Sequence, residues 1–300
     1  MTVMLARFEA WLCAPAPAER LAAIRIAVGA FVTVYMVVNV REFDRLGSRD
    51  PSAFDPIGVA RVLDTPLSAT SMWLLFGALL VSGCAFTVGI AVRVSGPAFA
   101  ILVLSWTSYH SSWGQLLHFE HLFTIHLLIL AFAPTAQAWA PGAKSPVAPD
   151  VRFGWPIRLL AIATATTYVL SGIAKLRLSG MAWFDADTLA NHIGYSAVRM
   201  ETIGARQPPL ASAVLQTRWL IPFMAAAALA VELGAPLALV GRKLRNGWML
   251  AALLFHAATA ATMQVFFGYR GLAFAMLPLF RLELVPTYFR RIPGRGHRAS

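Results

Sequence analysis

TPLSATSMWLLFGALLVSGCAFTVGIAV, residues 65–92, is a stretch without a single Lys, Arg, Asp or Glu. A helix needs about 20 mostly apolar residues to cross a bilayer, and this stretch is longer than that. Residues 94–119, 121–143 and 246–269 are also free of the four charged residue types. These four runs therefore predict four membrane-spanning helices.

Other apolar runs carry one or two charges each, and we interpret those charges as buried or as reaching the membrane surface. These runs are residues 21–40 with Arg25, 157–176 with Arg158 and Lys175, 219–241 with Glu232, and 271–288 with Arg281 and Glu283. Together with the charge-free runs, they predict an all-α fold. We expect a polytopic integral membrane helix bundle with about eight transmembrane helices.

The composition supports a membrane protein. Hydrophobic residues make up 58% of the 300-residue chain, charged residues only 13%, and the mean hydropathy is +0.64. Soluble domains have about 45–50% apolar and about 25% charged residues, so a soluble enzyme, a disordered chain and a fibrous protein are excluded. The net charge of +11 gathers at segment ends, which indicates contact with a lipid bilayer and not with nucleic acid. Cys13 and Cys84 are too few for a disulfide framework.

Charge and capping patterns give an expected organisation of the chain. We predict an N-terminal interfacial segment at 1–20, a transmembrane domain at 21–288 that includes an extramembrane or interfacial insertion at 177–218, and a basic cytoplasmic tail at 289–300. A helix is expected to begin at Asp185 or Asp187 within the insertion. The basic turn at 242–245 and the basic tail place both termini in the cytoplasm. We therefore expect a multi-pass protein of a bacterial cytoplasmic membrane.

Among the ionisable residues at membrane depth, the densest group is His118-Phe-Glu120-His121, followed by His126. In a helix, His118 and His121 share one face and Glu120 is turned away from it. Three interpretations stay open: a metal site, histidines hydrogen-bonded at a helix mouth, and a histidine that orients or acts on a substrate. A metal site needs further histidine clusters, which the chain does not offer, so we expect no metal.

A second polar group closes an apolar run. Tyr168, Ser171 and Lys175 lie on one helix face, and Gly172 allows a neighbouring helix or a ligand to come close. A Lys at a helix end commonly extends to the membrane surface. Alternatively, apolar surroundings favour the neutral amine, and a neutral Lys can act as a general base. Both interpretations stay open.

A third polar residue, His256, lies within the charge-free run 246–269. Its partner must come from another helix, and we expect that partner to be Glu232. The two would then form a pair in the membrane interior. Simple helix packing by a neutral histidine is the alternative interpretation.

With these motifs in order, the chain resembles the HTTM domain family, which is related to vitamin K-dependent gamma-carboxylase. The resemblance rests on Arg25 with the polar turn Arg41 to Arg45, the His-rich helix start through Leu127 to Pro134, the pattern from Tyr168 to Leu176 with Trp183 after it, and Phe255-His256 leading to Phe267-Gly268. In the carboxylase, the lysine that matches Lys175 deprotonates vitamin K hydroquinone, which then reacts with oxygen. His121 is the match for the family's earlier histidine, with His118 as the competing register, and His256 matches the later one.

The resemblance implies a membrane enzyme that acts on a quinol-like or other lipophilic substrate, with a quinone or hydroquinone as the candidate cofactor. It implies catalytic roles for Lys175, His121 and His256, and substrate contacts for Tyr168, Gly172, His118, Glu232 and Trp183. The 300 residues leave no room for the carboxylase's luminal peptide-binding domain, so we do not expect glutamate carboxylation. A small-molecule or proton carrier and a structural membrane subunit are the alternatives.

Overall fold

The computed structural model describes residues 2–116, 118–143 and 147–284, and α-helices and short 3₁₀ helices dominate this part. An isolated antiparallel bridge joins Ala16 and Asp150. The expected basic tail at 289–300 lies outside the described residues. The chain divides into two compact units, the first formed by Met1–Leu160 and Phe280–Ser300 and the second by Ala161–Leu279.

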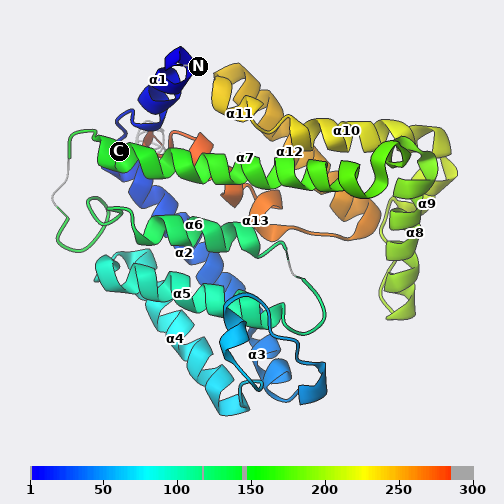
Figure 1. The fold of residues 1–300 in the computed structure, drawn as a ribbon, viewed down its shortest axis with the longest axis horizontal. Coiled ribbons are helices and arrows are strands. Elements are labelled where there is room, and N and C mark those ends of the chain that lie inside the picture. Colours follow the sequence, from blue (N-terminus) through cyan, green and yellow to red (C-terminus); the bar gives the residue numbers. More distant parts are fainter. Residues whose placement is uncertain (1, 117, 144–146, 285–300) are drawn as a thin grey trace, which may run out of the picture. The chain divides into compact units, whose positions relative to one another are not determined.

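The first unit is a bundle of long helices. Its elements are α1 (Thr2–Leu12), α2 (Ala18–Val38), α3 (Val40–Gly47), α4 (Ala69–Val88), α5 (Val92–His110), α6 (His121–Ala131), the first part of α7 (Val151–Ser179), and 3₁₀ helices at Pro51–Ala53, Gly58–Val62 and Leu282–Leu284. Helix α2 packs against α4 and α6, and α5 lies beside both α4 and α6 (Figure 1). The core of this unit therefore lies among four apolar helices.

Small residues bring α2 and α4 close together. A Cβ atom at Gly29 would lie 2.5 Å from Thr87 Oγ1, and a Cβ atom at Gly83 would lie 2.5 Å from Thr33 Oγ1. Each threonine hydroxyl donates a hydrogen bond to the carbonyl one turn earlier in its own helix. The threonine hydroxyls at this contact are thus hydrogen-bonded. The small glycine residues let the two helix backbones approach closely, as is common between helices in membranes.

Arg25 is buried in the first unit and does not reach the surface. Its Nη1 atom donates to the carbonyl oxygen of Thr135 at 2.6 Å, and its Nη2 atom donates to that of Trp139 at 2.7 Å. Both acceptors lie in the nonhelical segment that follows α6, so their carbonyls have no helical partner. The charge in this predicted span therefore ties α2 to the segment after α6.

The second unit surrounds a smaller core. It contains the rest of α7, α8 (Ala186–Thr202), α9 (Ala211–Gln216), α10 (Ile221–Leu233), α11 (Leu237–Val240), α12 (Arg242–Met263), α13 (Gly268–Gly271), and 3₁₀ helices at Gly180–Phe184, Arg218–Leu220 and Phe274–Leu279. Helices α8, α10 and α12 pack on one another (Figure 1). Trp183, Ile193 and Leu229 are buried together in one of its apolar clusters.

Three helical segments in the described part are long and apolar enough to cross a membrane: Ala18–Val38, Ala69–Val88 and Val151–Phe184. The expected number of about eight is not confirmed, and two of the other predicted spans end early or are interrupted. Helix α6 ends at Ala131, shortly before Pro134, and the run 219–241 is broken between α10 and α11 at Gly234 and Pro236. Proline is disfavoured in a helix interior because it lacks the N–H group that would bond the carbonyl one turn earlier.

The predicted span at 271–288 is wrong in its described part. Residues 274–279 and 282–284 form 3₁₀ helices, and Pro278 lies inside the first of them. Glu283 accepts hydrogen bonds from Arg20 at 2.8 and 2.5 Å. This charge-assisted pair between Glu283 and Arg20 holds the 3₁₀ helix at 282–284 against α2.

The region 177–218 is largely helical. Asp185 is the N-cap residue of α8, so the predicted helix start is confirmed. Leu189 and Ile193 of α8 are buried against the core of the second unit. This region is therefore part of the folded unit, and its placement at the membrane surface stays a prediction.

Candidate functional site

Lys175 of α7 and Glu232 of α10 form an ion pair in the second unit. The Nζ atom of Lys175 donates to Oε1 of Glu232. The carboxylate is deeply buried, with 4% of its side chain exposed, whereas the lysine side chain is 25% exposed. The amine is thus the more accessible member of the pair, and the carboxylate supports it from the interior.

Gly172 explains how α7 comes near enough to α10 for this contact. A Cβ atom at Gly172 would lie 2.8 Å from Cδ2 of Leu233 and 3.2 Å from Cβ of Glu232. Any larger residue would push against the Leu233 side chain at the end of α10. Since Gly172 precedes Lys175 by about one helical turn, the close approach delivers the amine to the carboxylate.

Trp183 borders the lysine. The Nζ atom of Lys175 lies 5.4 Å from the ring centroid of Trp183, within the range of a cation–π interaction. The indole Nε1 atom donates to the carbonyl oxygen of Ala225 on α10 at 3.1 Å, which fixes the ring. The lysine therefore has one charged partner and one aromatic partner, both anchored to α10.

Tyr168 and His256 form a second buried pair. The hydroxyl of Tyr168 on α7 lies 2.6 Å from Nε2 of His256 on α12. The expectation that Glu232 is the partner of His256 is wrong, because Glu232 pairs with Lys175 instead. Tyr168 lies on the same face of α7 as Lys175. This one face therefore supplies the partners of Glu232 on α10 and of His256 on α12.

Arg270, on the short helix α13, joins these two pairs and was not identified from the sequence. Its guanidinium carbon lies 5.6 Å from the ring centroid of Tyr168, and its charge interacts with Glu232 and His256. One feature of the sequence could have identified Arg270: it is the only Lys, Arg, Asp or Glu between residues 246 and 280. It brings a permanent positive charge to the group.

Three buried polar atoms of this group have no hydrogen-bond partner within the described chain: Oε2 of Glu232, Nδ1 of His256 and Nε of Arg270. Buried polar groups are nearly always paired, so unsatisfied atoms call for an explanation. If the Tyr168 hydroxyl donates to Nε2, the Nδ1 atom of His256 carries the proton, and in the other tautomer Nδ1 is a bare acceptor. We refer to Tyr168, Lys175, Glu232, His256 and Arg270 as the polar cluster.

An apolar pocket lies among α8, α10 and α12. Its volume is 340 Å³. It is lined by Leu189 and Ile193 of α8, by Met224, Ala227, Ala228 and Val231 of α10, and by Ala251, Leu254, Phe255, Ala258, Thr259, Thr262 and Met263 of α12. Two lining residues, Val231 and Phe255, directly precede Glu232 and His256 in the chain.

The other predicted site residues, His118 and His121, belong to the first unit. Both are exposed, and α6 begins at His121, so His118 lies in the turn before the helix. Glu120 between them is buried and accepts a hydrogen bond from the Tyr35 hydroxyl at 2.6 Å. Since His121 and Lys175 lie in different units, a cavity shared by His121, Lys175 and His256 stays a prediction.

No three His, Cys, Asp or Glu side chains gather as a metal ligand set within residues 2–116, 118–143 and 147–284. The chemistry that the polar cluster offers is the transfer of protons and the binding of an anion. A carboxylate, an amine, an imidazole and a phenol exchange protons, and Arg270 adds a fixed positive charge.

Comparison with known proteins places the chain in a family. A model of the HTTM domain matches residues 13–282, so the chain belongs to the HTTM domain family. No curated protein and no solved structure is detectably similar to it. The polar cluster and the apolar pocket both lie within the matched residues.

Proposed function

We propose that this HTTM-domain protein binds a lipophilic, quinol-like molecule in the membrane and removes a proton from its hydroxyl group, with Lys175 as the general base. The observation that carries the proposal is the Lys175–Glu232 pair, in which the amine is accessible and the carboxylate is buried. The proposed setting is a multi-pass protein of a bacterial cytoplasmic membrane, and the three long apolar helices support its place in a membrane.

The pair can accept one further proton. A single proton is shared between the amine of Lys175 and the carboxylate of Glu232, and in apolar surroundings the neutral form of the pair avoids separated charges. When the proton resides on Glu232, the neutral amine is free to take the hydroxyl proton of the substrate. The products are the ammonium of Lys175, a neutral Glu232 and the deprotonated substrate, so protons and charges balance.

The rest of the polar cluster suits the anion that this transfer leaves behind. Arg270 carries a positive charge that never depends on pH in the physiological range, and its Nε atom has no partner among the described residues. His256, held by Tyr168, offers its unpaired Nδ1 atom. We assign to these groups the binding and orientation of the substrate oxygen.

The apolar pocket suits the tail of such a substrate. Its walls are almost entirely aliphatic or aromatic, with Thr259 and Thr262 as the polar exceptions. A pocket of 340 Å³ is within the range that holds small organic molecules. One lipophilic ligand would therefore place its polar head at the polar cluster and its apolar tail in the pocket.

The proposal is tested with a menaquinol that has a short isoprenoid tail. Wild-type protein in phosphatidylcholine nanodiscs is expected to consume the quinol under oxygen faster than empty nanodiscs do, with the loss followed by mass spectrometry. Ala228→Leu narrows the apolar pocket and should slow the reaction, whereas Ala226→Leu, an exposed position on the same helix, should not. Consumption no faster than in empty nanodiscs would overturn the quinol assignment.

The structural-subunit alternative makes a different prediction. The ion pair is then only a contact between helices, and any substitution that keeps the charge of residue 175 preserves it. A lipophile extracted from the purified protein would support the enzyme. Its loss in Ala228→Leu, with retention in Ala226→Leu, would locate it in the apolar pocket.

A further inference from the structure

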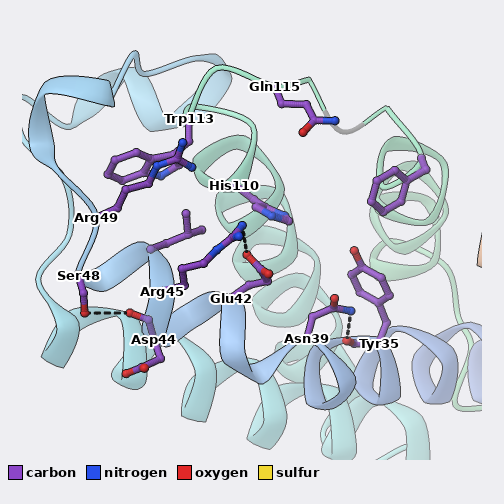
Figure 2. Close-up of a pocket in the computed structure, with 12 residues that line it drawn as sticks. Tyr35, Asn39, Glu42, Asp44, Arg45, Ser48, Arg49, His110, Trp113 and Gln115 are labelled. Carbon is purple, nitrogen blue, oxygen red and sulfur yellow. Dashed lines mark hydrogen bonds and ion pairs between the residues drawn. The ribbon is translucent and has the colours of Figure 1, made fainter. Parts of the chain in front are cut away.

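The first unit contains a second pocket, of 840 Å³, between the end of α2, α3 and the end of α5 (Figure 2). We call it the α3 pocket. Its wall includes Tyr35, Glu42, Arg45, Arg49, His110 and Trp113. Because α2 is a candidate span that ends at Val38, the pocket lies at the end of a span, where lipid head groups meet water.

Two arginines supply the positive side of the α3 pocket. The guanidinium carbon of Arg49 lies 5.3 Å from the ring centroid of Trp113, and no carboxylate in the described residues forms an ion pair with it. Arg45 pairs with Glu42 at 2.6 Å but is mostly exposed, so several of its N–H groups remain available. Figure 2 shows the guanidinium group of Arg45 beside Glu42 and near His110, and that of Arg49 against Trp113. Paired guanidinium groups are the preferred partners of phosphate oxygens.

His110 and Glu42 supply the hydrogen-bond acceptors of the α3 pocket. The buried carboxylate of Glu120 binds the Nδ1 atom of His110 at 3.2 Å and also accepts from the Tyr35 hydroxyl. In the tautomer that donates from Nδ1 to Glu120, the Nε2 atom of His110 is left as an acceptor, and His110 lines the pocket. Glu42 also extends into the pocket beside His110 (Figure 2), and one of its carboxylate oxygens is not used by Arg45.

A ligand that matches this arrangement carries a phosphate and, a few bonds away, a group with N–H donors. We propose that the α3 pocket binds the phosphoethanolamine head group of a phospholipid, with the phosphate on Arg45 and Arg49 and the ammonium on Glu42 and His110. The position at the end of a candidate span favours the lipid over a soluble compound with the same head group. Tyr35 and Trp113 add the aromatic side chains that are enriched at this depth of a membrane.

The test uses nanodiscs with an equimolar mixture of phosphatidylethanolamine and phosphatidylcholine, and native mass spectrometry counts the lipids that stay bound. Phosphatidylcholine carries the same phosphate, but its quaternary ammonium has no N–H donor. Wild-type protein should retain phosphatidylethanolamine in preference to phosphatidylcholine by about tenfold, the value of one charge-assisted hydrogen bond. Equal retention of the two lipids would overturn the proposal.

Two variants separate the two halves of the head-group site. Arg49→Gln should lower retention of both lipids by about tenfold. Glu42→Gln should abolish the preference, because it lowers retention of phosphatidylethanolamine to the level of phosphatidylcholine and leaves retention of phosphatidylcholine as in wild type. Arg61→Gln, in the same loop region but outside the pocket wall, is the matched control and should behave as wild type. The assignment is refuted if Arg49→Gln retains as much lipid as Arg61→Gln. It is also refuted if Glu42→Gln keeps the wild-type preference for phosphatidylethanolamine.

Free phosphoethanolamine distinguishes the lipid from a soluble source. If the pocket belongs to the lipid, free phosphoethanolamine at the same concentration should not displace the bound phosphatidylethanolamine. Displacement at equal concentration would contradict the lipid assignment. Circular dichroism of each variant confirms that the helical fold is unchanged, which is expected because Arg49 and Arg61 are both exposed.

Discussion

Lys175→Met removes the ammonium while it keeps a long apolar side chain against Trp183. The change leaves the carboxylate of Glu232, 4% exposed, without its partner. Loss of one member of a buried ion pair costs about 3–5 kcal/mol, and the 25% exposure of the lysine side chain places the value near the lower limit. About 3 kcal/mol corresponds to a change of about a hundredfold in the unfolding equilibrium constant. Protonation of Glu232 limits any larger cost.

The opposite change, Glu232→Gln, should cost less. It leaves an amine that can still reach water, so we expect about 1–2 kcal/mol, between the values for exposed and buried pairs. The double variant should be more stable than Lys175→Met alone, because no unpaired charge remains. Lys243→Met, at an exposed position, is the control and should stay within about 0.5 kcal/mol of wild type.

The assay is reversible unfolding in mixed micelles, followed by tryptophan fluorescence and by circular dichroism. Coincident transitions by the two probes establish that one equilibrium is measured. The reasoning is refuted if Lys175→Met unfolds like wild type, or if the costs of the two single changes simply add in the double variant.

Other consequences of the geometry are open to the same unfolding measurement. Gly172→Val should cost about 1–3 kcal/mol, because even a Cβ atom at this position lies 2.8 Å from a side chain of α10. Gly194→Ala, where a Cβ atom meets nothing within 4 Å, should be neutral or slightly stabilising. Tyr168→Phe should cost about 1–2 kcal/mol, because it removes the hydrogen bond to His256. Gly83→Leu should destabilise the first unit, because α2 and α4 could no longer pack closely; a stability equal to wild type would contradict that packing.

Apolar patterning alone predicted the helical class and the best-defined spans. The run 65–92 became α4, with Ser68 as its N-cap residue and Gly89 at its end in the left-handed conformation, φ 94°. Its length, caps and absence of charge all indicate the same helix. The expected span count was less reliable because hydropathy does not register where proline interrupts a helix, as at Pro236 and Pro278.

For the candidate site, spacing along one helix was informative and pairing between helices was not. The sequence places Tyr168 and Lys175 on one face of a helix, and the structure brings both to partners in the second unit. The partners could not be assigned, because the choice between Glu232 and His256 depends on where α10 and α12 cross α7. Arg270 was missed for the same reason, since it reaches the cluster only through the fold of the segment after α12.

The most direct test of the central claim is the rate of menaquinol consumption by Lys175→Arg, with Lys243→Arg as the control. Arginine keeps the positive charge and the ion pair with Glu232, but it does not release its proton. The general-base proposal predicts that Lys175→Arg folds as stably as wild type, still binds the quinol, and consumes it no faster than empty nanodiscs do. A Lys175→Arg protein that consumes the quinol at the wild-type rate would contradict the proposal and leave the pair as a contact between helices.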